Sequence, residues 1–310
     1  MLLHKTSGRW RLGLTLSLIT VFLWGILPLA LTVMLQVLDV YTLTWFRFAI
    51  AFGLLAAYLA ARQQLPSLQQ LRSTSLGLLA IATVFLGLNY LFYLQGLNHT
   101  SPTNAQVLIQ LAPVLLGLGG LVVFKERYTT GQWCGLGILA LGFTLFFHAQ
   151  LKTVLAAAST YLIGNSLIVV AAIVWAIYAL AQKQLLQKLP SSTIMLVIYG
   201  GCTLLFTPLA TPHPILTLNS LHLGLLVFCG LNTLMAYGAF AEALEHWEAS
   251  QVSAVLALTP LVTLSLVWTA SRFIPTLIAP EHWTGLGLLG AILVVCGSIS
   301  IALAKKAPAS

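Results

Sequence analysis

The sequence predicts an all-α integral membrane protein whose ten transmembrane helices form two inverted five-helix repeats, with both termini in the cytoplasm. Of its 310 residues, 59% are hydrophobic and 6% are charged, and the mean hydropathy is +0.97. This small number of charged side chains cannot form the polar surface of a soluble protein of this length. We therefore expect the protein to lie mainly in lipid. The apolar runs are continuous, which favours helices over a β-barrel, and the second half of the chain repeats the first.

A helix that crosses a bilayer needs roughly 20 apolar residues, so a chain of this length holds about ten of them. We expect the spans at residues 12–36, 40–61, 75–97, 102–123, 131–148, 161–186, 192–210, 219–243, 250–272 and 282–304. The first run is too long for a signal peptide. The expected organisation is a cytoplasmic segment 1–11, a first repeat 12–148, an outer linker 149–160, a second repeat 161–304 and a cytoplasmic tail 305–310.

The basic residues predict the orientation of these spans. If the N-terminus is cytoplasmic, eleven Lys and Arg residues fall inside, whereas Lys152 and Arg272 fall outside and Arg47 lies within a span. This asymmetry follows the positive-inside rule. The net charge of +8 is thereby explained by orientation, and no nucleic-acid partner is expected.

The repeat is visible as similar sequence segments that lie far apart in the chain. "LNHTSPTNAQVLIQLAP" from Leu97 aligns with "LEHWEASQVSAVLALTP" from Leu244 at a shift of 147, "LWGI" at Leu23 with "VWAI" at Val174 at 151, and "WCGLG" with "WTGLG" at 150. Five spans are repeated, and because five is odd the second copy enters the membrane inverted. Inverted repeats are typical of transporters that work by alternating access, with the substrate near the midplane.

The motifs that carry the repeat resemble a known family. "FLWGILP", "GLNHTSPTNAQVLIQLAPV" and "KERYTTGQWCGLGILALG", with "IVWAIYALAQK" and "ALEHWEASQVSAVLALTPL" in the second half, are similar to the EamA family of the drug/metabolite transporter superfamily. The resemblance covers essentially the whole chain. It implies ten helices, cytoplasmic termini and export or facilitated movement of small metabolites, often amino acids. Glu126 matches the family, but Phe273 stands at the corresponding place in the second half, so the outer connection there is atypical.

Amides and prolines mark the fourth and ninth spans. Gln106, Gln110 and Pro113 follow i, i+4, i+7 and so share one helix face. Amides are costly in lipid, so this face should either line a cavity or hydrogen-bond to neighbouring helices. Pro113 and Pro260 each free a backbone carbonyl one turn earlier and allow a bend, which could act in gating or be a tolerated kink.

Aromatic and amide side chains near mid-span suggest a substrate cavity. Trp24 and Trp175 are symmetric partners placed away from the helix ends, where interface tryptophans usually lie. Each candidate could instead be plain core packing. A cavity of amides, phenols and indoles suits neutral or zwitterionic metabolites such as aromatic or branched amino acids. The predicted substrate-binding residues are Trp24, Asn89, Tyr90, Tyr93, Gln106, Gln110, Trp175, Tyr178, Asn232 and Tyr237.

Charged side chains raise two further hypotheses. Arg47, about two turns inside the outer end of its span, could hold a substrate carboxylate, although snorkelling to the outer headgroups is slightly favoured. Glu242 could pair with Lys183 as an inner gate. The acidic patch around Glu242, Glu245, His246 and Glu248 lies at a cytoplasmic helix end, where charges are solvated, and no metal site is expected.

The energy source and the rival functions follow from what the sequence lacks. No Asp or Glu is expected near the middle of a span, so we expect a facilitator or exchanger, with a proton-coupled exporter of another metabolite or drug class as the alternative. No phosphate-binding loop or cofactor motif is present. An intramembrane enzyme is a remote alternative, because the chain has a single Asp and no GxSxG or HExxH. The expected location is a bacterial inner membrane, and glycine-rich runs leave monomer and homodimer open.

Overall fold

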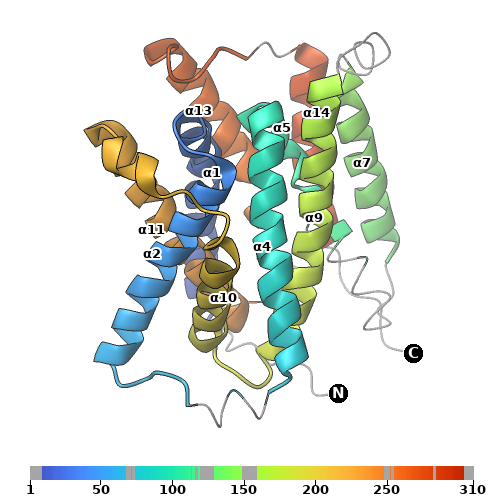
Figure 1. Cartoon of the computed structure of the whole chain (residues 1–310). Coiled ribbons are helices and arrows are strands. Elements are labelled where there is room, and N and C mark those ends of the chain that lie inside the picture. The colour runs from blue at the N-terminus through green and yellow to red at the C-terminus, as the bar shows by residue number, and fades with distance from the viewer. Residues whose placement is uncertain are drawn as a thin grey trace.

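Helices form all the regular structure that the described residues contain, which confirms the all-α prediction (Figure 1). The computed structural model describes residues 9–67, 71, 74–112, 114–115, 118, 129–148, 159–247, 252, 255–281 and 284–303. Within them lie ten α-helices and one 3-10 helix, each α-helix overlapping one predicted span. They are α1 (Trp10–Met34), α2 (Val40–Ala61), α4 (Leu76–His99), α5 (Pro102–Leu108), α7 (Thr130–Phe146), α9 (Ser159–Leu185), α10 (Ser191–Phe206), η1 (His213–Thr217), α11 (Ser220–His246), α13 (Thr259–Phe273) and α14 (Gly285–Leu303).

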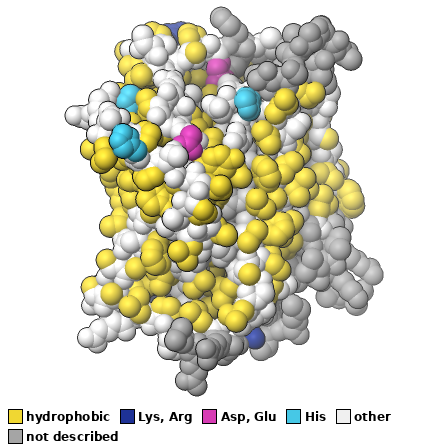
Figure 2. Space-filling model, viewed as in Figure 1, with side chains coloured by type: hydrophobic (Ala, Val, Ile, Leu, Met, Phe, Trp, Pro, Cys, Tyr) yellow, Lys and Arg dark blue, Asp and Glu magenta, His cyan; other side chains and the backbone are white. Residues whose placement is uncertain are grey.

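Length and composition make five described helices capable of crossing a membrane. They are Trp10–Met34, Val40–Ala61, Leu76–His99, Leu162–Leu185 and Ser220–Ala243. Thr130–Phe146, Ser191–Phe206 and Gly285–Ile301 are also apolar but shorter than the roughly 20 residues of a typical span. On the face shown in Figure 2, hydrophobic side chains cover the middle of the bundle, and charged and histidine side chains lie toward its ends. This distribution is the one expected for a lipid-embedded bundle.

Side-chain caps decide where several helices begin. The Asp39 carboxylate accepts hydrogen bonds from the backbone N–H groups of Tyr41 and Thr42 at the start of α2. Ser75, Ser101 and Asn219 cap α4, α5 and α11 in the same way, and Thr129 forms a capping box with Gln132 at α7. Such caps satisfy N–H groups that have no partner within the helix.

The two halves of the chain interlock. α1 packs mainly against α11, α4 against α9, α7 against α14, α5 against α13, and α2 equally against α10 and α11. Each pair takes one helix from each half, so neither half forms a separate bundle. Figure 1 shows α4 and α9 side by side along most of their length.

Two ends of the bundle serve as reference points. The connection between α1 and α2 (residues 35–39) marks the α1–α2 end, and the connection between α9 and α10 (residues 186–190) marks the opposite, α9–α10 end (Figure 1). At the α1–α2 end the Thr211 hydroxyl donates to Asp39 Oδ2 at 3.1 Å. Partial burial raises the pKa of Asp39, but hydrogen bonds from Thr42 and Thr211 outweigh it and hold the pKa below its usual value. This link joins the two halves across that end.

Glycines allow α7 and α14 to touch backbone to backbone. A Cβ on Gly142 would lie 2.6 Å from the Val294 nitrogen and 2.9 Å from the Gly290 carbonyl oxygen. A Cβ on Gly135 would lie 3.0 Å from the carbonyl oxygen of Gly297. Small residues permit this close approach in membrane helices. The glycine-rich runs therefore pack inside one monomer, which is one of the two arrangements that the sequence left open for them.

Replacing Gly142 with Ala is expected to destabilise the protein by about 1–3 kcal/mol. The added methyl group would clash with the backbone of α14, which can move only if the whole helix shifts. Gly137→Ala is the matched control, since it lies on the same helix and a Cβ there meets nothing within 4 Å. Both changes bring the same gain in helix propensity. Thermal unfolding in detergent should show a lower midpoint for Gly142→Ala, and equal midpoints would contradict this packing.

Candidate functional site

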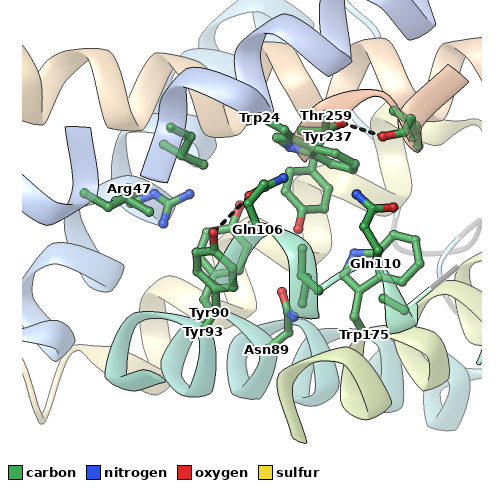
Figure 3. A pocket seen from close by; sticks show the side chains of 15 residues that line it. Trp24, Arg47, Asn89, Tyr90, Tyr93, Gln106, Gln110, Trp175, Tyr237 and Thr259 are labelled. Carbon is green, nitrogen blue, oxygen red and sulfur yellow. Dashed lines mark hydrogen bonds between the residues drawn. The ribbon is translucent and has the colours of Figure 1, made fainter. Parts of the chain in front are cut away.

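A pocket of about 110 Å³ lies among helices from both halves of the chain. This volume is several times the roughly 10–15 Å³ that a single water molecule needs. Eight of the ten predicted substrate-binding residues and Arg47 line it, and Figure 3 shows their side chains around one space. The lining residues are Trp24, Leu27, Leu31, Arg47, Asn89, Tyr90, Tyr93, Gln106, Ile109, Gln110, Ala112, Trp175, Tyr237, Leu256 and Thr259.

Arg47 carries the only formal charge among the described residues that line the pocket. The side chain is 3% exposed and its guanidinium points into the pocket (Figure 3). The slightly favoured interpretation that it snorkels to the headgroups is therefore wrong. The α2 register points this residue toward α4 and α11, so its charge is held between helices and away from lipid.

Neutral groups hold the guanidinium in place. Arg47 Nε donates to Thr233 Oγ1 at 3.1 Å, and that hydroxyl donates in turn to the Cys229 carbonyl at 3.0 Å. The Arg47 Cζ lies 4.4 Å from the centroid of the Tyr90 ring, a cation–π distance. None of the described carboxylates pairs with Arg47. A buried guanidinium that is fixed but has no counter-ion is prepared to bind an anion.

Amides from α4 and the α5 segment face the same space. Gln106 Oε1 accepts a hydrogen bond from the Tyr93 hydroxyl at 3.1 Å, and Asn89 Nδ2 donates to the Ala171 carbonyl at 2.9 Å. Gln110 is 4% exposed, and its Oε1 atom has no hydrogen-bond partner among the described residues. Leaving a buried carbonyl unpaired costs about 1–3 kcal/mol, so a ligand that donates to Gln110 would recover this energy.

Aromatic rings form the other wall. Trp24 and Tyr237 meet edge to face with centroids 5.2 Å apart, and Tyr90 and Tyr237 lie 5.8 Å apart. Trp175 contacts Phe240 at 6.0 Å, and so does Trp24 at 5.5 Å. In Figure 3, Trp24, Trp175 and Tyr237 lie on the side of the pocket away from Arg47. The pocket thus has a cationic end and an aromatic end.

Two helix interruptions border the pocket. α5 ends at Leu108 and is followed by a turn at residues 109–110, and α13 begins at Thr259 after a turn at residues 257–258. Pro260 has no N–H to offer the Leu256 carbonyl, which instead accepts from the Thr259 hydroxyl at 2.6 Å. The helix is thus interrupted at residues 257–258, just before Pro260, and the freed carbonyl is the one expected a turn earlier. Pro113 lies outside the described residues.

Four predicted residues stand away from the pocket. Tyr178 is fully buried beside Met195, and the Asn232 amide donates to the Leu23 carbonyl at 2.7 Å, which links α11 to α1. The Glu242 carboxylate lies 3.3 Å from His246 Nε2. The proposed pairing of Glu242 with Lys183 in another conformation stays a prediction.

Several lining residues were not foreseen. Leu27, Leu31, Ile109, Ala112 and Leu256 are apolar, and nothing in a single sequence separates a pocket-lining leucine from a core leucine. Thr259 in the lining, and Thr233, which holds Arg47 from outside the lining, carry a usable signal. Each has a hydroxyl in a predicted span, and Thr259 immediately precedes the proline of the repeat.

The lining defines what the pocket can do. It offers one cation, amide donors and acceptors, a threonine hydroxyl and aromatic faces, but none of its described residues is a carboxylate, histidine or cysteine. This set can bind a small polar solute reversibly. It contains no nucleophile paired with a base, which bond-breaking chemistry needs.

Comparison with known proteins agrees with this chemistry. The profile of the EamA-like transporter family matches residues 11–148 and again 162–303. The chain is 38% identical over 296 residues to the uncharacterized inner membrane transporter YhbE of Escherichia coli K12, covering 95% of this chain and 92% of that one. It is 24% identical over 296 residues to a probable amino-acid metabolite efflux pump of Salmonella typhimurium, covering 91% and 92% of the two chains.

A solved crystal structure shares the fold. It superposes with a TM-score of 0.66 over 93% of this chain and 96% of that chain, at 18% sequence identity. Family profile matches in both halves and a relative of similar length at 38% identity are decisive for the family. The chain belongs to the EamA-like transporter family, and it is a membrane transporter rather than an enzyme.

Proposed function

We propose that this transporter carries small neutral or zwitterionic metabolites, chiefly amino acids with aromatic or other apolar side chains, out of the cytoplasm through the pocket. One observation carries the proposal: Arg47 is a buried cation that pairs with none of the described carboxylates, at one end of a pocket whose other end is aromatic. An amino acid complements both ends.

The α-carboxylate fits the cationic end. A charge-assisted pair with a guanidinium in a site of low dielectric is worth roughly twice a neutral hydrogen bond. The ammonium group of the same substrate can donate to the unpaired Gln110 Oε1 and lie against Trp24, Trp175 or Tyr237, since aromatic faces attract cations by roughly 0.5–2 kcal/mol. An apolar side chain would contact Leu27 and Leu31. A phosphorylated solute would need a second basic residue, and Arg47 is alone among the described lining residues.

The relatives support this substrate class. The Salmonella protein that is 24% identical over nearly the whole chain is named a probable amino-acid metabolite efflux pump. The Escherichia coli relative is named an inner membrane transporter, which supports the same location here. Export from the cytoplasm and a bacterial inner-membrane location are accordingly part of the proposal.

The proposed mechanism is alternating access between two inverted repeats, with the termini in the cytoplasm. It is supported by the two family profile matches, by the positive-inside distribution of Lys and Arg, and by helix interruptions beside the pocket in both halves. Broken helices at the midplane are a recurring feature of transporters with inverted repeats. Under this orientation the α1–α2 end faces outward and the α9–α10 end faces the cytoplasm.

The proposed energy source is the gradient of the substrate itself. Proton-coupled carriers usually place a titratable carboxylate or histidine on the transport path, and the described pocket lining has neither. Asp39 lies at the α1–α2 end, and its lowered pKa keeps it ionised near neutral pH, so it is a poor proton carrier. The protein is thus proposed to act as a facilitator or exchanger.

The first test is counterflow of labelled amino acids into liposomes that contain the pure protein and unlabelled amino acids. We expect the wild type to accumulate at least one of tryptophan, phenylalanine, leucine, glutamine and threonine. Trp175→Ala should lower this rate at least about tenfold because it removes the aromatic wall. Trp268→Ala is the matched control, because Trp268 is exposed on α13 and contacts Arg272. Equal loss in both variants would argue against the pocket.

The second test concerns Arg47. Arg47→Met should weaken inhibition of counterflow by an amino acid about 10–100-fold and leave inhibition by the corresponding amine, which lacks the carboxylate, nearly unchanged. Arg47→Lys should retain part of the discrimination because it keeps the charge but not the two-pronged geometry. The thermal midpoint of Arg47→Met should not fall, since the change removes a buried charge that none of the described carboxylates neutralises. If Arg47→Met distinguishes the amino acid from the amine as well as the wild type does, Arg47 does not bind the substrate carboxylate.

The third test addresses coupling. Counterflow should be insensitive to a protonophore and to an imposed pH gradient at constant substrate gradient, because the described lining holds no group that exchanges protons near neutral pH. If accumulation collapses with the protonophore, the carrier is proton-coupled and the alternative, an exporter driven by protons, takes its place.

A further inference from the structure

Part of the pocket lining consists of residues that correspond to one another in the two halves of the repeat. At a shift of 151 Trp24 corresponds to Trp175, and at a shift of 147 Tyr90, Ile109 and Ala112 correspond to Tyr237, Leu256 and Thr259. Both members of all four pairs line the pocket. The pseudo-symmetric centre of the molecule therefore coincides with the middle of the pocket.

The rest of the lining comes from one half only. The seven remaining residues all belong to the first half, namely Leu27, Leu31, Arg47, Asn89, Tyr93, Gln106 and Gln110. α1 runs from Trp24 through Leu31 toward the α1–α2 end. The pocket thus extends from its symmetric centre toward that end.

The counterparts of Leu27 and Leu31 are polar. The segment "WGILPLAL" from Trp24 aligns without gaps with "WAIYALAQ" from Trp175, so Leu27 corresponds to Tyr178 and Leu31 to Gln182. These two residues lie on α9 between the pocket and the α9–α10 end. They are 0% and 2% exposed and take no part in the pocket lining.

Both polar side chains are poorly satisfied where they lie. The Tyr178 hydroxyl and Gln182 Nε2 each point to the sulfur of Met195, at 3.7 and 3.6 Å, and Gln182 Oε1 has no hydrogen-bond partner in the described part of the chain. Thioether sulfur is a weak acceptor, and an unpaired amide oxygen inside a membrane protein is costly and is usually functional. Met195 is unbranched and adapts easily to a new neighbour. The contacts of Tyr178 and Gln182 with Met195 are therefore weak, and breaking them costs little free energy.

We propose that Tyr178 and Gln182 become substrate-facing in the opposite conformation, in which the pocket extends from the same centre toward the α9–α10 end. This inference rests on the alternating access proposed above. Exchange of the two halves gives Tyr178 and Gln182, at the α9–α10 side of the centre, the pocket-lining role that Leu27 and Leu31 have now on the α1–α2 side. The pocket then pairs their unsatisfied groups with water or with the polar atoms of an amino acid. Gln182 is thus a substrate-contacting residue that the pocket in this structure does not reveal.

Cysteine accessibility tests the exposure without relying on transport. In a background with Cys134, Cys202, Cys229 and Cys296 replaced, single cysteines are placed at Tyr178, Gln182, Leu31 and Ile168. A charged, membrane-impermeant methanethiosulfonate is then applied to each side of sealed membrane vesicles. Ile168→Cys is the buried control, because Ile168 lies on the same helix, is 0% exposed and packs against Gly96.

We expect Gln182→Cys and Tyr178→Cys to react from the α9–α10 side at least about tenfold faster than Ile168→Cys, and Leu31→Cys to react from the α1–α2 side. Reaction of Gln182→Cys no faster than the control from either side would overturn the inference, and counterflow by the wild type would then still support the proposed function. Absence of wild-type counterflow with the expected labelling would instead leave this inference standing and remove the amino-acid substrate.

Gln182→Leu separates a transport role from a structural one. The variant recreates the residue of the first half and removes an unsatisfied amide, so its thermal midpoint should be unchanged or higher. Counterflow should nevertheless fall at least about fivefold. A fully active variant, or one whose midpoint falls together with its activity, would contradict a substrate-facing role.

Discussion

Inside a bilayer, every polar group must find its partner within the protein or in an enclosed cavity, and this constraint decides where irregular backbone and charge can lie. In the described residues the helix interruptions at 109–110 and 257–258 both border the pocket. The Leu256 carbonyl, which Pro260 leaves without a backbone donor, accepts a hydrogen bond from the Thr259 hydroxyl, and both residues line the pocket. Arg47 obeys the same constraint, since a hydroxyl and an aromatic face hold it. The pocket, the helix interruptions and the buried cation therefore occur together, because each would leave polar groups without partners if it faced lipid.

The sequence was most informative where lipid imposes a strong pattern. Continuous apolar runs predicted each α-helix. Polar side chains at mid-span predicted most of the lining, because an amide such as Gln110 has few stable places other than a cavity or a helix contact. Asn232 took the second of these places and joins α11 to α1. Which alternative holds depends on how neighbouring helices rotate against each other, and that is decided by packing such as the glycine contact of α7 with α14.

Arg47 illustrates the limit of reasoning from depth along one helix. Its distance from the helix end allowed a snorkelling side chain, and the position alone gave no sign of the Tyr90 ring or the Thr233 hydroxyl, which come from α4 and α11. Leu27 and Leu31 illustrate another limit, because leucine fits lipid, core and pocket equally well. Their role became visible through the counterparts Tyr178 and Gln182, whose polarity is hard to explain in a permanently closed core.

The two halves share a sequence pattern but differ in charge. Leu38 and Thr42 at the start of α2 align with Leu189 and Thr193 at the start of α10, so the counterpart of Arg47 is Ile198, which is fully buried. In the opposite conformation the pocket would exchange Leu27, Leu31 and Arg47 for Tyr178 and Gln182, and Ile198 would bring no cation in place of Arg47. A carboxylate would then bind more tightly in the conformation described here, and a ligand shifts an equilibrium toward the state that it binds better, by at most the difference in binding free energy. Substrate should therefore populate this conformation and protect Gln182, whereas an amine without a carboxylate should shift the balance much less.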